Sequence, residues 1–477
     1  MIRKKIFTCM ANYLVVLFLL FLFRFIPPLG GVSEVGMQVI GVFAGVIYGW
    51  ITIGIGWPSV LGIAAFGMTD YMGMTDLLST AFGSQTMVMI MTLLLLAAFV
   101  QQSDLTDLIL HFLLSRKSAA GKPFLVLFYF LFAGFIASIL SHCLAVLIIF
   151  LELFKEMMRK SDIKPYSNAV PCLFVGMSYA FVLGDIALPF KSTAIVGIGA
   201  YEAITGSQMN LLQYTLFMFP LCTFCIASYV LCCKYVFKID LSQLVGHTLP
   251  QIDSKNLPIE KKIAFIAVIV AMALLLLPSV VPSDWALSGI LGKMGLGGLS
   301  LFILSALLMI RVKGVPLMDL QKTARYFSWN VFFVLCFLLP IASALSSDVV
   351  GLKQILTHGA TALLQGMPSL SIILVIVLMS AIASNFANNL VVCGIFVAIA
   401  CFMGDVIAMD LRTVSCLIIA GSSISIFFPA ASPLNAVLFS QKELVTFTQE
   451  FYLGIKTCLI QCVLLSLVGT FWGIVVF

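Results

Sequence analysis

Long runs of apolar residues recur along the 477-residue chain, and short polar segments that hold most of the charged side chains separate them. A helix needs about 20 apolar residues to cross the ~30 Å hydrocarbon core of a membrane, and most of these runs have about that length. Strands of a membrane barrel alternate apolar and polar residues and would not give such continuous runs. The pattern therefore predicts an all-α polytopic membrane protein with about 11 transmembrane helices. The predicted spans cover residues 6–26, 35–50, 53–69, 86–101, 168–188, 209–233, 261–281, 294–310, 328–345, 412–428 and 451–475.

The composition agrees with this pattern. Hydrophobic residues make up 62% of the chain and charged residues 10%, whereas soluble proteins average about 25% charged residues. This balance excludes a set of soluble domains, a disordered chain, a nucleic-acid-binding module and a secreted disulfide scaffold. The 13 cysteines are scattered without the spacing of a metal site, so we expect no metal and no cofactor. The net charge of +6 is then a signal of topology, because Lys and Arg concentrate on the cytosolic side.

The first apolar run follows a basic N-terminal segment. It is too long for the apolar region of a signal peptide, and it ends in Pro27 and Pro28 instead of a small-residue cleavage site. We therefore expect residues 1–34 to form an N-terminal spanning helix with its N-terminus in the cytosol. The expected location is the bacterial inner membrane.

The apolar run at 123–151 is too long for one span. Its 29 residues would form a helix of about 44 Å. Basic residues flank it on both sides, namely Arg116, Lys117, Lys122, Lys155, Arg159, Lys160 and Lys164. Since both ends then belong to the cytosolic side, we predict a re-entrant helical hairpin at 123–155 that turns near Ser138, Ser141 and His142. A single tilted span is the alternative.

A second hairpin is predicted at 366–405, on the opposite side of the membrane. Residues 366–404 lack Lys and Arg, and Asp405 and Asp410 follow them. The polar residues in the middle of this run are Ser380, Ser384, Asn385, Asn388 and Asn389.

The two halves of the chain repeat the same order of elements. Asp76 precedes Ser141 by 65 residues, and Asp319 precedes Ser384 by 65. Each half has five predicted spans and one hairpin, and an odd number of spans places the two copies in opposite orientations. The predicted organisation is a first inverted repeat at 35–237, a cytosolic linker at 238–260 and a second inverted repeat at 261–477. Inverted repeats are typical of secondary transporters, whose binding site lies at the repeat interface near the membrane midplane.

Each repeat also contains a predicted broken helix, at 168–204 and at 412–445. Proline and small residues interrupt both spans, and proline removes a hydrogen-bond donor and clashes with the preceding turn. Non-helical backbone at membrane depth is tolerated only where it is buried in protein or lines a cavity. Carbonyl groups freed by the break can bind a cation, and the N-terminus of the following half-helix can bind an anion. We therefore expect each hairpin tip to face a break, and the four elements to form one site.

Polar groups at membrane depth are the candidate functional residues. The candidates for substrate binding are Ser141, His142, Lys191, Ser192, Thr193, Ser384, Asn385, Ser432 and Pro433. The candidates for cation binding or coupling are His142, Asp185, Asn385, Asn388, Ala431 and Asn435.

Several of these residues have more than one interpretation. Lys191 either forms a structural ion pair with Asp185, or it supplies a fixed positive charge that binds an anion or replaces a bound cation. His142 is either a proton-coupling group or a neutral, hydrogen-bonded side chain at the turn. Asn388 and Asn389 either bind ligand or tie helices together.

At these motifs the chain resembles the divalent anion:sodium symporter (DASS) family of the ion-transporter superfamily. That family has a Ser-Asn-Thr motif at each hairpin tip, opposite an unwound span that contains Pro and Asn. Here Ser384 and Asn385 match the second motif, and the sequence 432–435 matches the turn opposite it. The resemblance implies a scaffold domain that forms a homodimer and a transport domain that moves as an elevator. It also implies a di- or tricarboxylate or sulfate as substrate, with sodium as the coupling ion near Asn385 and Asn435.

The first motif departs from this family pattern. Ser141, His142 and Cys143 stand where Ser-Asn-Thr is expected. The sequence 189–191, which ends in Lys191, stands where a Pro-Pro-Asn-like turn is expected. An ammonium group beside the site would repel sodium. Our hypothesis is that Lys191 substitutes for one cation, so that fewer sodium ions, or protons, drive each cycle.

Other functions are alternatives to a symporter of a small anion. An arsenite-type exporter or a sodium/proton antiporter of the same superfamily is the main alternative, with Asp185 as the proton carrier. A membrane enzyme would need a convergent catalytic set such as HExxH, which the sequence lacks. A channel would not need the duplicated binding motifs.

Overall fold

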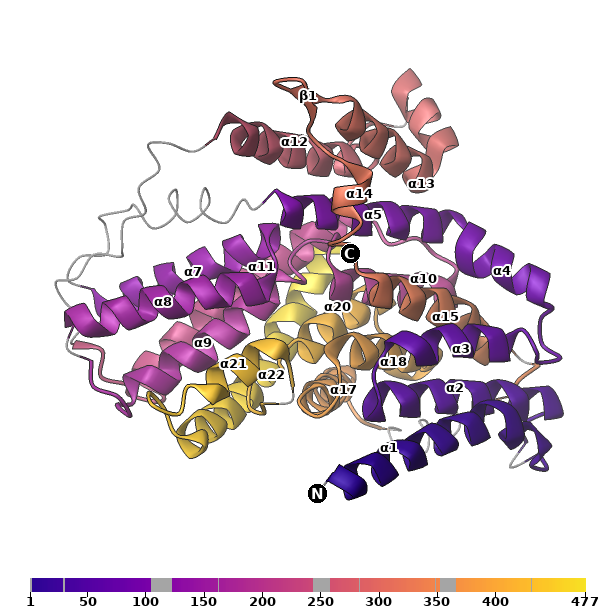
Figure 1. Cartoon of the computed structure of the whole chain (residues 1–477), viewed down its shortest axis with the longest axis horizontal. Coiled ribbons are helices and arrows are strands. Elements are labelled where there is room, and N and C mark those ends of the chain that lie inside the picture. Colours follow the sequence, from indigo (N-terminus) through magenta and orange to yellow (C-terminus); the bar gives the residue numbers. More distant parts are fainter. Residues whose placement is uncertain are drawn as a thin grey trace.

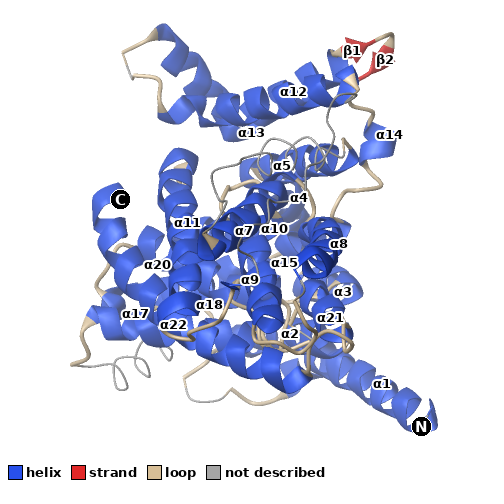
Figure 2. Ribbon diagram, turned by 90° about the vertical axis from the view of Figure 1, so that its left-hand side faces the viewer, coloured by secondary structure: helices blue, strands red, loops and turns tan. Residues whose placement is uncertain are grey.

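The computed structural model describes residues 2–28, 31–103, 122–161, 163–242, 258–282, 284–347, 349–351, 366–429 and 431–477. In this part of the chain nearly all regular structure is helical (Figures 1 and 2), and the all-α prediction is confirmed. The helices up to the linker are α1 (Ile2–Leu17), η1 (Phe18–Leu22), η2 (Phe23–Phe25), α2 (Glu34–Thr52), α3 (Gly56–Phe66), α4 (Met74–Gly83), α5 (Gln85–Gln102), α7 (Pro123–Leu140), α8 (Cys143–Ser161), α9 (Ala169–Gly184), α10 (Ser192–Thr205) and α11 (Leu211–Tyr235).

The elements after the linker are α12 (Ile259–Leu276), η5 (Leu277–Ser279), α13 (Ala286–Met309), β1 (Arg311–Val312), β2 (Val315–Pro316), α14 (Leu320–Thr323), α15 (Trp329–Ser346), α17 (Ser369–Ser384), α18 (Asn389–Phe402), α19 (Gly404–Ile407), α20 (Leu411–Ser422), α21 (Pro433–Ser440) and α22 (Phe447–Val476). The two strands form a short antiparallel ribbon in which Arg311 pairs with Pro316. The sequence did not predict this ribbon. It turns at Lys313 and Gly314, which both have positive φ, the conformation that a tight hairpin turn requires.

Each predicted span contains a helix, although several ends differ. Six of the described helices are long and apolar enough to cross a membrane, namely α2, α5, α7, α11, α13 and α22. Most of the other spans contain shorter apolar helices, at Met10–Phe25, Gly56–Phe66, Ala169–Gly184, Trp329–Leu345 and Leu411–Ser422. The helix predicted at 294–310 begins at Ala286 and kinks at Gly295, whose φ is 59°. This positive φ favours glycine, because residues with a side chain rarely adopt it.

Both predicted hairpins are pairs of helices joined by a tight turn. In the first pair α7 ends at Leu140 and α8 begins at Cys143, and the two helices pack together. The alternative of one tilted helix is therefore wrong, because a single helix would not turn at Ser141. In the second pair α17 ends at Ser384 and α18 begins at Asn389, and these helices also pack together.

In both halves of the chain, the helix before the break packs against the hairpin of the same half. Helix α9 packs against α7 and α8, and α20 packs against α17 and α18. Helix α10 packs on α18, and α21 packs on α8. Each half-helix that follows a break therefore contacts the hairpin of the other half. Of the linker predicted at 238–260, residues 243–257 lie outside the described residues.

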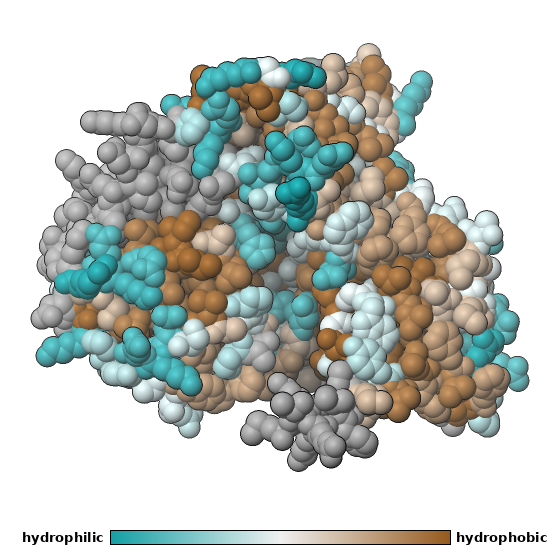
Figure 3. Space-filling view, in the orientation of Figure 1, coloured by the Kyte–Doolittle hydropathy of each residue, from teal (hydrophilic) through white to brown (hydrophobic). Residues whose placement is uncertain are grey.

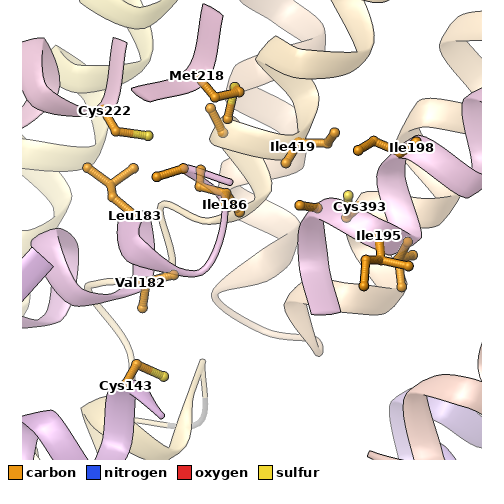
Figure 4. Close-up of a cluster of buried hydrophobic side chains, with 14 of the residues drawn as sticks. Cys143, Val182, Leu183, Ile186, Ile195, Ile198, Met218, Cys222, Cys393 and Ile419 are labelled. Atoms are coloured by element: carbon orange, nitrogen blue, oxygen red, sulfur yellow. The ribbon is translucent and has the colours of Figure 1, made fainter. Parts of the chain in front are cut away.

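The broken helices lie in the centre of the molecule. Every residue of α9 is buried, as are Thr193 to Glu202 of α10 and Thr413 to Ser422 of α20. Figure 4 shows Ile186 of the first break among apolar side chains of neighbouring helices, including Leu183 of α9, Met218 of α11 and Ile419 of α20.

Outer helices cover this centre. Helices α12 and α13 form a separate layer above α5, and α1, α2 and α3 pack together at another edge (Figures 1 and 2). Hydrophobic side chains cover broad areas of the face in Figure 3. Large apolar side chains are exposed along outer helices, for example Ile474 and Val475, each 73% exposed. Such a surface suits contact with lipid chains.

Candidate functional site

The first break lies between α9 and α10, against the tip of the first hairpin. Helix α9 ends at Gly184 because the following turn leads into Pro189. A Cβ atom on Gly184 would lie 2.6 Å from the Ser138 Cβ and 2.8 Å from the Phe135 carbonyl oxygen. The absence of a side chain at this position therefore allows the broken helix to contact the hairpin backbone directly.

Lys191, the last residue of the first break, reaches back to this hairpin tip. Its ammonium nitrogen donates to the carbonyl oxygens of Ser138 at 2.6 Å and Ser141 at 2.5 Å. It also lies 3.2 Å from Oδ1 of Asp185, so the two side chains form an ion pair. The Lys191 side chain is 12% exposed and that of Asp185 is 26% exposed. The positive charge thus lies at the carboxyl end of α7, where the helix dipole favours a cation.

In the second half, an asparagine rather than a lysine joins the hairpin tip to the break. Asn385 follows α17 and is fully buried. Its Nδ2 donates to the carbonyl oxygens of Ala381 at 2.8 Å and Ile424 at 2.9 Å, and its Oδ1 accepts from the Phe427 amide at 3.0 Å. The Asn385 side chain therefore satisfies backbone groups on both sides of the contact. The Oδ1 atom keeps a second lone pair that can bind a cation.

Asn435 stabilises the second break from its other side. It is fully buried, and its Nδ2 donates to the carbonyl oxygens of Ser425 at 2.8 Å and Phe428 at 3.1 Å. Its Oδ1 accepts a hydrogen bond from the hydroxyl of Ser178, which belongs to α9. One side chain thus connects the second break to the broken helix of the first half.

The two half-helices that follow the breaks begin with the predicted anion-binding segments. Ser192 and Thr193 open α10, and the Cys393 thiol of α18 donates to the Thr193 carbonyl oxygen at 3.6 Å. Ser432 caps α21 by accepting from the Asn435 amide at 3.2 Å, and Pro433 is its first residue. Uncapped N–H groups at the start of a helix favour a negatively charged ligand.

The remaining predicted residues have local roles in this structure. His142 is exposed, and its Nδ1 accepts from the Leu144 amide at 3.3 Å at the start of α8. Asn388 is exposed and caps α18 by accepting from the Leu390 amide at 2.9 Å. Ser384 donates to the Ala381 carbonyl within its own helix at 2.9 Å. Ala431 is buried in the second break.

Sequence reasoning missed two polar residues at the site, Ser178 and Ser425, and one buried carboxyl group near the second break, Glu450. Ser178 lies in an apolar helix whose sequence gives no sign that it contacts Asn435. Ser425 lies in the second break, where its hydroxyl accepts from Asn389 Nδ2 at 2.8 Å. Glu450, a buried carboxyl group at the start of α22, immediately precedes the span predicted at 451–475. Only Ser425 had a signal in the sequence, because it lies in the segment 421–425, in which four of the five residues are Gly or Ser.

A largely apolar cavity borders the first break. It is lined by Leu96, Ala97, Phe99, Val100, Gln101, Ile139, Ser141, Leu188, Phe190, Lys191, Val268, Ala271, Met272, Leu275 and Leu307. The cavity therefore lies between the first hairpin tip and the outer helices α5, α12 and α13. Lys191 is the only charged residue in its lining among the described residues.

Outside the site, one ion pair fixes the start of α20. Arg412 lies 2.5 Å from the Asp410 carboxylate and holds the pKa of Asp410 below its usual value by hydrogen bonding to it. Arg412 also donates to the Phe477 carbonyl at 3.0 Å. The chain end and the start of α20 are therefore held together.

Helical breaks that face hairpin tips in two halves define a secondary transporter. A family model described as "Citrate transporter" (CitMHS) matches residues 43–347. This match covers well over half of the chain, and the protein belongs to the citrate transporter family. The predicted membership of the ion-transporter superfamily is thereby confirmed, and the protein is a transporter rather than an enzyme.

Two solved transporter structures show the same fold. The YdaH transporter of Alcanivorax borkumensis is 16% identical with a TM-score of 0.57, and the match covers 83% of this chain and 87% of that one. MtrF of Neisseria gonorrhoeae, described as one of a class of antimetabolite efflux pumps, is 14% identical with a TM-score of 0.55. That match covers 83% of each chain. Among the curated proteins, none matches the sequence.

Proposed function

We propose that this secondary transporter carries a small anion, namely a di- or tricarboxylate or sulfate, and that sodium or protons drive it. The family description makes citrate, a tricarboxylate, the first candidate. The starts of α10 and α21 supply the anion-binding N–H groups, with hydroxyl groups from Ser192 and Ser432. We also propose that the hairpins and broken helices move together as an elevator, in a homodimer located in the inner membrane. The contacts between each half-helix and the opposite hairpin support movement as one body.

The coordination of Lys191 is the observation that carries this proposal. Its ammonium group lies among two carbonyl oxygens and one carboxylate oxygen, at 2.5–3.2 Å. Oxygen atoms of these kinds are the ligands that hard cations prefer in proteins. In the proposed mechanism the lysine is a tethered cation that replaces one sodium ion. Because it is covalently attached to the chain, this cation neither binds nor dissociates during the cycle.

Replacement of Lys191 by asparagine is therefore expected to change the ion dependence of transport. Asparagine leaves the carbonyl oxygens and Asp185 without the ammonium group, so a free sodium ion has to take its place. We expect uptake without sodium to fall about tenfold, since one charge-assisted hydrogen bond is worth at least ~1.5 kcal/mol. The sodium-to-substrate ratio should rise by one. Uptake of labelled citrate and sodium into proteoliposomes measures both quantities.

The matched control is Lys164→Asn, because Lys164 is an exposed lysine outside the break. This variant should keep the wild-type rate and ion dependence. If Lys191→Asn has unchanged ion dependence and stoichiometry, the tethered-cation mechanism is wrong. Sodium/proton exchange without any anion would instead support the antiporter alternative, with Asp185 as the proton carrier.

A further inference from the structure

A row of buried polar side chains follows one face of α22. Glu450, Thr457 and Gln461 are at most 1% exposed, and their spacing of seven and four residues places them on the same helix face. Each has a polar atom without a hydrogen-bond partner among the described residues, namely Oε2 of Glu450, Oγ1 of Thr457 and Nε2 of Gln461. A buried polar atom left unpaired costs about 1–3 kcal/mol. Three such atoms in one row indicate a role that offsets this cost.

The middle of this row rests directly on the second break. Gly454 lies between Glu450 and Thr457 on the same face of α22. A Cβ atom on Gly454 would lie 2.7 Å from the Phe427 Cβ and 3.0 Å from the Ile426 carbonyl oxygen. Glu450 is therefore one helical turn away from the backbone of the break.

The far end of the row reaches the site from another direction. Oε1 of Gln461 accepts from the hydroxyl groups of Tyr179 at 3.2 Å and Ser228 at 3.0 Å. Ser178, the neighbour of Tyr179 in α9, donates to Asn435. The row thus extends from Glu450 to the helix that holds Asn435 in place.

No opposite charge balances the Glu450 carboxyl group among the described residues. Helix α22 packs against α9, α11, α17 and α20. Among the described residues, the titratable groups near the far end of the row are Tyr179, which donates to Gln461, and the cysteines around it, namely Cys222, Cys225, Cys458 and Cys462. Helix α17 has no titratable residue, and Arg412 of α20 is paired with Asp410. Lys456 of α22 is exposed. An ionised, unpaired carboxylate in this position would be far more costly than a protonated one.

We propose that Glu450 is a proton-binding site whose occupancy is linked to the second break. A hydronium ion transfers a proton to the Glu450 carboxylate. An O–H bond of the hydronium ion breaks, an O–H bond forms on the carboxyl group, and a water molecule is released. Thr457 and Gln461 continue the polar path along α22 towards α9. The link between protonation of this site and movement of the anion rests on the proposed function. Protonation of Glu450 itself is independent of the proposed function.

Infrared difference spectroscopy of the purified protein tests the site itself. The variant is Glu450→Gln, and the control is Glu443→Gln, which alters an exposed carboxylate seven residues earlier. At neutral pH we expect the C=O band of a protonated carboxylic acid to disappear in Glu450→Gln and to remain in the control. The thermal midpoint of Glu450→Gln should match the wild type, because glutamine resembles the neutral acid. An unchanged band, or a large loss of stability, would overturn the proposal.

Transport in proteoliposomes tests the link to the break. In Glu450→Gln, we expect the rate of citrate uptake driven by an inward proton gradient to fall at least tenfold. Citrate counterflow, which needs no proton gradient, should continue. Gradient-driven uptake at the wild-type rate would refute the link. If the wild type transports none of the anions but the infrared band behaves as expected, the proposed function fails and the proton site stands.

Discussion

Replacement of Asn435 by alanine is expected to lower transport at least a hundredfold. Alanine removes the Nδ2 group that donates to the carbonyl oxygens of Ser425 and Phe428. It also removes the Oδ1 atom that accepts from the Ser178 hydroxyl. Because two of these hydrogen bonds are buried and the third is partly buried, we expect a loss of about 3 kcal/mol in the free energy of unfolding. The second break would then lose its connection to α9, and with it the fixed geometry of the start of α21. Citrate uptake and the thermal unfolding midpoint measure the two effects.

Asn388→Ala is the matched control for this substitution. Asn388 is also an asparagine beside the second hairpin tip, but it is exposed and only caps α18. Loss of such a cap costs about 1 kcal/mol. If Asn435→Ala behaves like Asn388→Ala in both measurements, Asn435 does not hold the break and our description of the site is wrong.

Gly184→Ala is expected to reduce transport at least tenfold through packing alone. The new methyl group would lie 2.6 Å from the Ser138 Cβ, 2.8 Å from the Phe135 carbonyl oxygen and 3.1 Å from the Ile139 amide nitrogen. Two of these three atoms belong to the backbone, so a change of side-chain rotamer cannot relieve the clash. Overpacking of this kind costs about 1–3 kcal/mol. It would also push the hairpin tip away from Lys191 and disturb the ammonium contacts.

The same substitution elsewhere provides the control. Gly292 lies in α13, and nothing lies within 4 Å of a Cβ atom built there. Because alanine favours helix more than glycine by about 1 kcal/mol, Gly292→Ala should be neutral or slightly stabilising. Comparison of uptake rates and thermal midpoints for both variants separates a packing defect from a general effect of the substitution. Equal behaviour of the two variants would contradict the tight contact at Gly184.

The hairpins and breaks were predictable because charge and proline mark them directly. Basic residues on both sides of 123–151 required the chain to return to its starting side, and the turn occurs at Ser141 as expected. The candidate pair of Lys191 and Asp185 was also predictable, since an ammonium group at membrane depth needs a partner. These signals are local, so one sequence is enough to detect them.

The contacts between the halves were not predictable in this way. Ser178 binds Asn435 across 257 positions of sequence, and a serine in an apolar helix is ordinary. Glu450 immediately precedes the apolar run at 451–475, where a charged residue is expected to face the aqueous boundary. The helix in fact begins at Phe447, after a capping box formed by Thr446 and Gln449, and this early start places Glu450 inside the packed core. Such placements depend on tertiary packing, which periodicity does not encode.

The central claim is that a small anion binds between the hairpin tips and the breaks. Thermal unfolding of the purified protein with citrate, dicarboxylates and sulfate, each with and without sodium, tests it most directly. Ligand at a hundred times its Kd stabilises the folded state by about 2.7 kcal/mol. We therefore predict that at least one of these anions raises the unfolding midpoint of the wild type by several degrees, and that Asn435→Ala shows a smaller rise. If none of the anions raises the midpoint, with or without sodium, the claim is contradicted.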